Sequence, residues 1–318
     1  MQHLLSITDL HTTFNGPHGT TRAVNGISLT IDIGCTVALV GESGSGKSMT
    51  ALSVMRLVPP PGLITSGSIS FESTNLLELS DKEMRAMRGS RISMIFQEPM
   101  TSLNPVLRIG DQVSEPFIIH RNFSRREAME RSIELLNKVG IPSAGDRLRD
   151  YPHQLSGGMR QRVMIAMALA CNPTLLIADE PTTALDVTIQ AQILELLDSI
   201  RQASDMGILL ITHDLGIVAE RSDYTYVMYA GRVVEAAPTR ELFENPRHPY
   251  TLALLASLPQ NSEPGKPLTT ITGQAPNLDT ALSGCGFCNR CPIAQPVCRQ
   301  ELPDMREVLP GHTVRCWQ

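Results

Sequence analysis

The order of apolar and polar positions along the chain predicts an α/β fold. Short, mostly apolar runs, typical of strands buried in a parallel sheet, occupy residues 36–40, 175–179 and 208–212. Polar residues follow each run directly, and ligand-binding groups gather at the carboxyl ends of such strands. We therefore expect three core strands whose ends carry the chemistry of the protein.

The segments between these runs predict two further kinds of structure. Residues 1–35 contain period-two alternation and a turn-rich stretch at 15–19, which indicates antiparallel strands. Residues 68–72 and 91–96 alternate in the same way. Between 98 and 172 the pattern becomes helical, so we expect an inserted helical subdomain there.

A glycine-rich loop follows the first apolar run, and a helical pattern opens after it at Met49. Glycines let backbone N–H groups converge on phosphate oxygens at the start of a helix. Lys47 can reach the outer phosphates and Ser48 can ligate magnesium. We therefore predict a nucleotide site rather than a Gly/Ser-rich turn that binds nothing. The loop residues are Gly41, Glu42, Ser43, Gly44, Ser45, Gly46, Lys47 and Ser48.

Size and composition limit the class of protein. The chain has 318 residues, of which 42% are hydrophobic and 19% charged, as in a well-packed globule of two or three structural units. Its net charge of −5 does not favour direct binding to nucleic acid or to an acidic membrane. The apolar runs are shorter than the roughly 18 residues that a membrane span needs, and no signal-peptide pattern is present. We expect a cytosolic chain, or one held at a membrane by other subunits.

Two acidic residues end the second apolar run. A carboxylate such as Asp179 at the end of a buried strand is costly unless it meets a cation, which we expect to be the magnesium also held by Ser48. The adjacent Glu180 can orient and deprotonate a water molecule that attacks the γ-phosphate. The structural alternative is that both residues only cap the strand before Pro181.

The octet Leu-Ser-Gly-Gly-Met-Arg-Gln-Arg at 155–162, together with the loop and the carboxylates, resembles the signature of ABC-type ATPase subunits. Ser156, Gly157 and Gly158 precede a helix expected from Met159, so their bare amides form a second anion site. In the family this site binds the ATP held by the opposite subunit, which implies a dimer with two enclosed ATP molecules.

The resemblance implies a P-loop NTPase ABC cassette with three parts. We expect a RecA-like parallel-sheet core, with an antiparallel β edge, in residues 1–97 and 173–238. The helical subdomain with the signature is expected at 98–172. A small C-terminal extension of the oligopeptide-transporter type is expected at 239–318.

The resemblance also assigns roles to four further residues. Phe14 is similar to the aromatic residue that stacks on adenine, and Gln97 to the glutamine that joins magnesium and the attacking water to the transporter interface. Asp186 is the carboxylate of the loop 183–186 that touches the partner subunit. His213 resembles the switch histidine that contacts the γ-phosphate. Because the catalytic positions are all filled, we expect hydrolysis; those positions are Lys47, Gln97, Glu180 and His213.

Three segments resemble the ATPases of dipeptide, oligopeptide and nickel importers: residues 97–105, residues 245–251 with the apolar helix up to Pro259, and the cysteine-rich tail. The resemblance implies an ATPase of a peptide-class importer, peripheral on the cytoplasmic face of the inner membrane. Its expected partners are a second, identical or homologous ATPase subunit, two transmembrane permease subunits and an extracytoplasmic solute-binding protein. Dipeptide, oligopeptide, glutathione, opine and nickel remain open as cargo.

Five of the seven cysteines lie in the tail. Cys285, Cys291, Cys298 and Cys316 have a spacing similar to a four-cysteine iron–sulfur site, and Cys288 adds an alternative ligand. Thiolates suit a [4Fe–4S] cluster and also zinc, so both ligands and free thiols stay open.

Two other functions compete with transport. A soluble ABC ATPase acting on nucleic acid or ribosomes usually carries two fused cassettes or a long coiled-coil insertion, whereas this chain has one cassette, no heptads and an acidic balance. A small-molecule kinase built on a phosphate loop would leave the octet at 155–162 unexplained.

Overall fold

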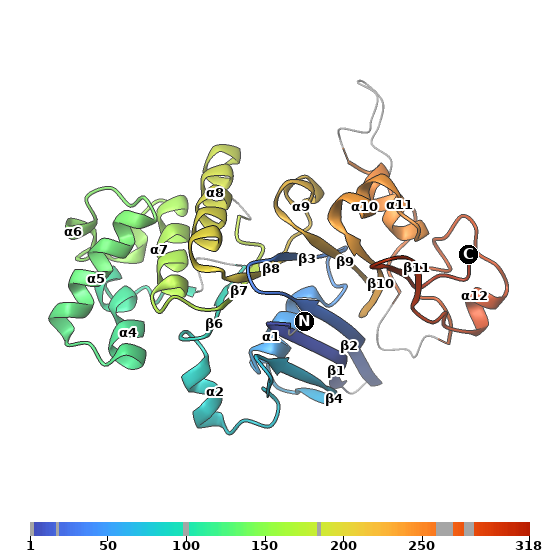
Figure 1. Cartoon of the computed structure of the whole chain (residues 1–318), viewed down its shortest axis with the longest axis horizontal. Helices are drawn as coiled ribbons and strands as arrows, with labels where there is room; N and C mark the ends of the chain where they lie inside the picture. The colour runs from blue at the N-terminus through green and yellow to red at the C-terminus, as the bar shows by residue number, and fades with distance from the viewer. Residues whose placement is uncertain (1–2, 17–18, 98–101, 183–185, 259–269, 277–282) are drawn as a thin grey trace. The chain divides into compact units, whose positions relative to one another are not determined.

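The computed structural model describes residues 3–16, 19–97, 102–182, 186–258, 270–276 and 283–318 (Figure 1). The chain divides into two compact units. The first comprises Met1–Ile31, Thr36–Leu77 and Ile211–Gln318, and the second comprises Asp32–Cys35 and Glu78–Leu210.

The first unit contains a four-stranded antiparallel sheet of order β2-β1-β4-β5. β1 pairs with β2 on one side and with β4 on the other, and these strands run side by side in Figure 1. Alternate side chains of β1, among them Leu5 and Ile7, are buried, as the period-two pattern predicts. The antiparallel strands predicted within residues 1–35 are confirmed, and with β4 and β5 they form a sheet separate from the one that contains β3. The strands are β1 (Leu5–Gly16), β2 (Gly19–Ile31), β4 (Gly62–Phe71) and β5 (Thr74–Asn75).

A second set of strands in the first unit has the order β11-β12-β10-β9-β3. β3 is parallel to β9, and the pairs from β9 to β11 are antiparallel. The five residues of β3 are all buried, as its apolar sequence predicts. These strands are β3 (Thr36–Val40), β9 (Tyr224–Tyr229), β10 (Arg232–Pro238), β11 (Arg306–Leu309) and β12 (His312–Val314).

The helices of the first unit are α1 (Lys47–Val54), α9 (Leu215–Arg221), α10 (Thr239–Glu244), α11 (Pro249–Ala256) and α12 (Val297–Gln300). α1 begins at Lys47, ahead of the predicted Met49. α1 ends at Val54, and Arg56 then adopts a left-handed backbone with φ +50° that stops the helix. The phosphate-loop lysine is thus itself the first residue of the helix.

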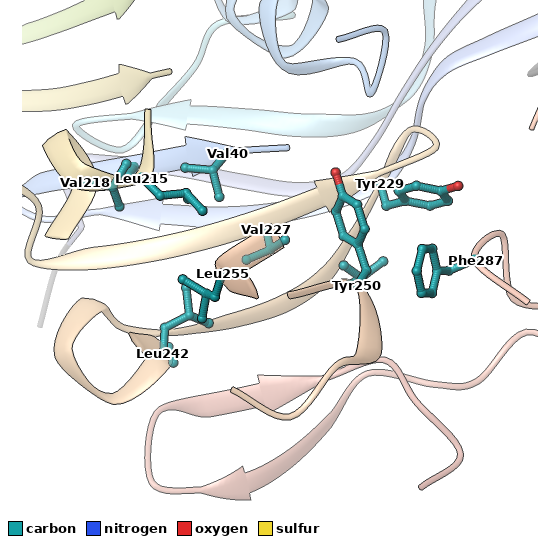
Figure 2. Packing of buried hydrophobic residues seen from close by; sticks show 12 residues of the cluster. Val40, Leu215, Val218, Val227, Tyr229, Leu242, Tyr250, Leu255 and Phe287 are labelled. Carbon is teal, nitrogen blue, oxygen red and sulfur yellow. The ribbon is translucent and has the colours of Figure 1, made fainter. Parts of the chain in front are cut away.

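One hydrophobic cluster joins β3 to the C-terminal extension (Figure 2). It includes Val40 of β3, Tyr229 of β9, Tyr250 of α11 and Phe287 of the tail. The rings of Tyr229 and Tyr250 have centroids 4.6 Å apart, and the Phe287 ring lies 5.3 Å from each. Phe287 is 1% exposed, and burial of a phenylalanine side chain contributes about 1.5–3 kcal/mol. The extension is therefore part of the core of the first unit.

The second unit has the strand order β8-β7-β6, with β6 parallel to β7. All three are buried along their length, which confirms the core strands predicted from the apolar runs at 175–179 and 208–212; β6 lies in the segment 91–96, which is predicted as an alternating strand. Helices occupy most of the described part of 98–172, as predicted; α5 begins with a capping box in which Ser124 and Glu127 satisfy each other's backbone amides. The strands are β6 (Ile92–Ile95), β7 (Leu175–Asp179) and β8 (Gly207–Ile211). The helices are α2 (Asp81–Met87), α4 (Ile109–Arg121), α5 (Arg125–Lys138), α6 (Ala144–Arg147), the 3-10 turn η1 (Pro152–Gln154), α7 (Gly157–Leu169) and α8 (Val187–Ser204).

Across the described residues, every helix is too short or too polar to traverse a bilayer.

Candidate active site

The glycine loop lies between β3 and α1, and its shape is fixed by close backbone contacts. Gly41 has φ +150°, and a Cβ atom there would lie 2.1 Å from the carbonyl oxygen of Met228. Gly46 has φ +103°, and its Cβ would lie 2.2 Å from the carbonyl oxygen of Ala23. Any side chain at either position would collide with backbone, so only glycine fits.

Lys47 is held against this loop. Its side chain is almost fully buried, and Nζ donates hydrogen bonds to the carbonyl oxygens of Gly41 at 2.7 Å and Glu42 at 2.9 Å. Ser48 follows in the first turn of α1, while Ser43 and Gly44 are exposed. An ammonium group and helix N-terminal amides beside a glycine loop are the donors that phosphate oxygens require. The residues present therefore fit a nucleotide triphosphate.

Two other residues predicted to contact ATP, Phe14 and His213, lie in the first unit but outside the loop 41–48. Phe14 of β1 is half-buried, and its ring packs so closely on Gly62 that a Cβ there would lie 2.5 Å from Phe14 Cε1. His213 follows the end of β8 and is exposed. The next residue, Asp214, caps α9 by accepting hydrogen bonds from the amides of Gly216 and Ile217. His213 is thus held between a strand end and a capped helix.

In the second unit, the carboxylates predicted at the end of β7 are in place. Asp179 is the last residue of β7 and is 3% exposed. Glu180 has a left-handed backbone with φ +48°, which costs a non-glycine residue about 1–3 kcal/mol. Gln97 Nε2 donates a hydrogen bond to Glu180 Oε2 at 3.1 Å across 83 residues of sequence. The structure therefore brings together the predicted base and the predicted glutamine.

The signature residues form an exposed helix start. α7 begins at Gly157, not at the predicted Met159, because Ser156 is the N-cap and its Oγ accepts the Met159 amide at 3.3 Å. Ser156 and Gly157 are exposed, and a Cβ at Gly157 would meet no atom within 4 Å. The amides at the start of α7 are thus open to an anion.

Asp186 also caps a helix, since its Oδ1 accepts the Ile189 amide at 2.9 Å at the start of α8. The other residues of the predicted partner-contacting loop, 183–185, lie outside the described residues, as do 98–101 of the importer-like segment and Pro259.

The sequence reasoning missed Gln161. This side chain is 2% exposed, and its Nε2 donates a hydrogen bond to the carbonyl oxygen of Pro181, the residue after Glu180. The contact ties the signature helix to the turn that carries the predicted base. Its only signal in the sequence is a polar residue inside the signature octet.

The five tail cysteines line one cavity, together with Phe287 and His248. All are free thiols, and burial raises the pKa of the Cys285 thiol to about 11. Among the residues that the structure describes, no three Cys, His, Asp or Glu side chains are placed to hold one metal ion. The five thiols belong to Cys285, Cys288, Cys291, Cys298 and Cys316.

A glycine loop between a buried strand and a helix that starts with lysine, and a second buried strand that ends in two carboxylates, define a P-loop nucleotide hydrolase. Residues 24–183 match the ABC transporter family, and residues 234–298 match the C-terminal region of oligopeptide/dipeptide transporters. The chain belongs to the ATP-binding subunits of ABC transporters, and it is an ATPase.

Similar proteins extend over the whole chain. A putative peptide import ATP-binding protein of Brucella melitensis is 52% identical and covers 100% of this chain and 98% of its own length. The dipeptide transport ATP-binding protein DppD of Bacillus subtilis is 50% identical over 100% of this chain and 95% of its own length.

Solved structures are similar over the cassette. A dimeric ATP-binding cassette in a post-hydrolysis state with ADP and phosphate has a TM-score of 0.68 at 28% identity, covering 74% of this chain and 99% of its own. A cassette of the CbiONQ ABC transporter complex from Clostridium perfringens has a TM-score of 0.63 at 29% identity, covering 77% of this chain and 92% of its own.

Proposed function

We propose that this ATPase is the motor subunit of a peptide importer. The observation that carries the proposal is the match of residues 234–298 to the oligopeptide/dipeptide transporter region, beside full-length relatives named for peptide or dipeptide transport. Its functional division is a nucleotide-binding core at 1–97 and 173–238, a helical subdomain at 98–172 and an extension at 239–318.

ATP binds at the loop 41–48. The Lys47 ammonium keeps its hydrogen bonds to the loop carbonyls and directs its remaining N–H at the phosphates, and the N-terminal amides of α1 stabilise their negative charge. The side chains of Ser48, Asp179 and Gln97 carry the hard oxygen donors that would hold magnesium, which supplies positive charge against the phosphates. Phe14 stacks on the adenine.

Hydrolysis uses Glu180 as the general base. A water oxygen attacks the γ-phosphorus, the bond to the bridging oxygen of ADP breaks, and the water proton passes to the Glu180 carboxylate. Gln97 orients that carboxylate through its 3.1 Å hydrogen bond. The constrained backbone of Glu180 fixes the position from which the side chain extends. His213 contacts the γ-phosphate and reports its loss.

The active form is a dimer. The amides at Ser156, Gly157 and Gly158 of one subunit bind the ATP held by the loop of the other, and Asp186 contacts the partner subunit. The exposed start of α7 supports this arrangement, because those amides are open to a ligand from outside the chain. Closure on ATP and reopening after hydrolysis drive two permease subunits, and a solute-binding protein delivers the cargo. The subunit then sits peripherally on the cytoplasmic face of the inner membrane.

The tail cysteines hold a [4Fe–4S] cluster. Five thiols around one cavity supply more sulfur ligands than the four that a cluster needs. Zinc, which cysteine thiolates also bind, is the alternative ligand of the same thiols. Iron and sulfide analysis after anaerobic purification tests this proposal; a colourless protein with stoichiometric zinc would contradict it.

The transport function is tested by capture from membranes. The Glu180→Gln variant, held in its ATP-bound state, should recover two permease subunits from solubilised membranes and should have no ATP turnover in the assembled complex. Glu195→Gln, a matched change at an exposed position of α8, should keep normal turnover. Recovery of ribosomes or DNA in place of permeases would support the soluble-ATPase alternative.

A further inference from the structure

An ion pair joins the cysteine-rich tail to the phosphate loop within the first unit. The Arg290 guanidinium donates two hydrogen bonds to the Glu42 carboxylate, from Nη1 to Oε2 at 2.7 Å and from Nη2 to Oε1 at 2.9 Å. The Arg290 side chain is 6% exposed and that of Glu42 is 28% exposed. A bidentate pair of this kind fixes both position and direction, and a water-poor environment strengthens it.

Glu42 is also held through its backbone. Its amide donates a hydrogen bond at 2.8 Å to the hydroxyl of Tyr250, a fully buried residue of α11. Its carbonyl oxygen accepts one of the two hydrogen bonds that fix the Lys47 ammonium. The C-terminal extension therefore positions the residue whose carbonyl holds the phosphate-binding lysine.

Arg290 has several fixed contacts besides Glu42. Its guanidinium donates to the Tyr229 hydroxyl at 3.2 Å and to the carbonyl oxygens of Ile271 and Thr272, and it lies 5.8 Å from the centroid of the Phe287 ring. These contacts hold the Arg290 side chain in one position between the tail and the loop, unlike a mobile surface cation.

The residues that anchor the tail alternate with its thiols. In the segment 285–291, cysteines stand at 285, 288 and 291, while Phe287 enters the core and Arg290 reaches Glu42. Cys285 and Cys291 pack against the same core. A change in what the thiols bind must therefore shift the short backbone segment that carries Arg290.

We propose that Arg290 is a positioning residue for the phosphate loop. Through Arg290, a change in what the tail cysteines bind changes the affinity of the loop for ATP. The proposal rests on loop 41–48 being the ATP site.

The first experiment measures equilibrium binding of a fluorescent ATP analogue to the purified full-length chain. Arg290→Ala should weaken binding by roughly 5- to 150-fold, the usual range of coupling between two sites. Glu42→Gln should weaken it similarly, and Arg290→Lys should restore only part, because an ammonium cannot make the paired contact. In turnover assays the KM for ATP should rise while kcat changes little. Arg299→Ala, at an exposed arginine of the same tail, is the matched control and should bind normally.

The second experiment tests the path through Arg290. Cys291→Ser should weaken ATP binding in the native background but add nothing in the Arg290→Ala background, because the two changes act through one contact. Equal effects of Cys291→Ser in both backgrounds, or none in either, would overturn the coupling.

The variant Lys47→Ala distinguishes a wrong coupling through Arg290 from a wrong assignment of the loop 41–48 as the ATP site. If Lys47→Ala loses ATP while Arg290→Ala and Arg290→Lys both bind it normally, the proposed coupling is wrong and the loop assignment stands. If Lys47→Ala also binds normally, the loop assignment itself is wrong. Circular dichroism melting curves that match the native chain show that each variant has folded.

Discussion

The left-handed backbone at Glu180 leads to a prediction whose sign can be tested. Glu180 has φ +48°, a region that glycine adopts freely and that other residues adopt at a cost. We expect Glu180→Gly to be more stable than Glu180→Ala, although glycine usually destabilises a folded protein relative to alanine. Both variants lose the hydrogen bond from Gln97, so the difference between their free energies of unfolding reports only the cost of the left-handed backbone.

The magnitude follows from the conformation. A residue with a Cβ atom in the left-handed region costs about 1–2 kcal/mol relative to one without. Glycine loses more chain entropy on folding, which offsets about 0.5–1 kcal/mol of that difference. The Gly variant should therefore be more stable by up to about 1.5 kcal/mol, with a thermal midpoint higher by roughly 2–4 °C per kcal/mol.

The assay is urea and thermal unfolding followed by far-ultraviolet circular dichroism. The matched pair Glu195→Gly and Glu195→Ala, at an exposed site inside α8, should show the opposite order by about 1 kcal/mol. If Ala is also the more stable choice at position 180, the backbone there is not strained and the argument for a strained catalytic turn is refuted.

Both Glu180 variants should lose roughly 100- to 10,000-fold in ATP turnover, as expected for loss of a general base.

Three further changes test other parts of the account. Gln97→Ala should lower kcat by roughly 10- to 100-fold, because a hydrogen bond to a charged group contributes about 1.5–3 kcal/mol; an unchanged kcat in steady-state assays would argue against the orienting role. Phe287→Ala should lower the free energy of unfolding of the first unit by about 3–5 kcal/mol, measured by denaturant titration, and a loss below about 1 kcal/mol would mean that the tail does not complete the core. Burial raises the pKa of the Cys171 thiol, which keeps it protonated at pH 8, so iodoacetamide should leave it unmodified in the native chain by mass spectrometry and label it only after unfolding.

The parts of the fold that depend on local pattern could be predicted from the sequence. The apolar runs at 36–40 and 175–179 form the strands β3 and β7. Both strands are buried along their whole length, so nearly every position in them is apolar and the run is visible in the sequence. The loop 41–48 was predictable because Gly41 and Gly46 have to be glycine. Helix limits were less predictable: α7 starts at Gly157, where the Ser156 cap outweighs the low helix propensity of glycine.

The contacts that join distant segments could not be predicted. Nothing near Glu42 in the sequence indicates that Arg290, 248 residues away, would pair with it. Tyr250 fits an apolar helix equally well whether or not its hydroxyl accepts the Glu42 amide. Gln161 is one polar residue among several in the signature, and only its burial against Pro181 sets it apart. Such contacts are set by tertiary packing, which leaves no periodic signal.

In the proposed dimer, two chains enclose each ATP between the loop 41–48 of one and the start of α7 of the other. Structure determination of the Glu180→Gln variant with MgATP tests it most directly. We expect a dimer in which each triphosphate touches Lys47 of one subunit and the amides at 156–158 of its partner. A triphosphate that touches only its own subunit's loop, with the start of α7 facing solvent, would contradict the account.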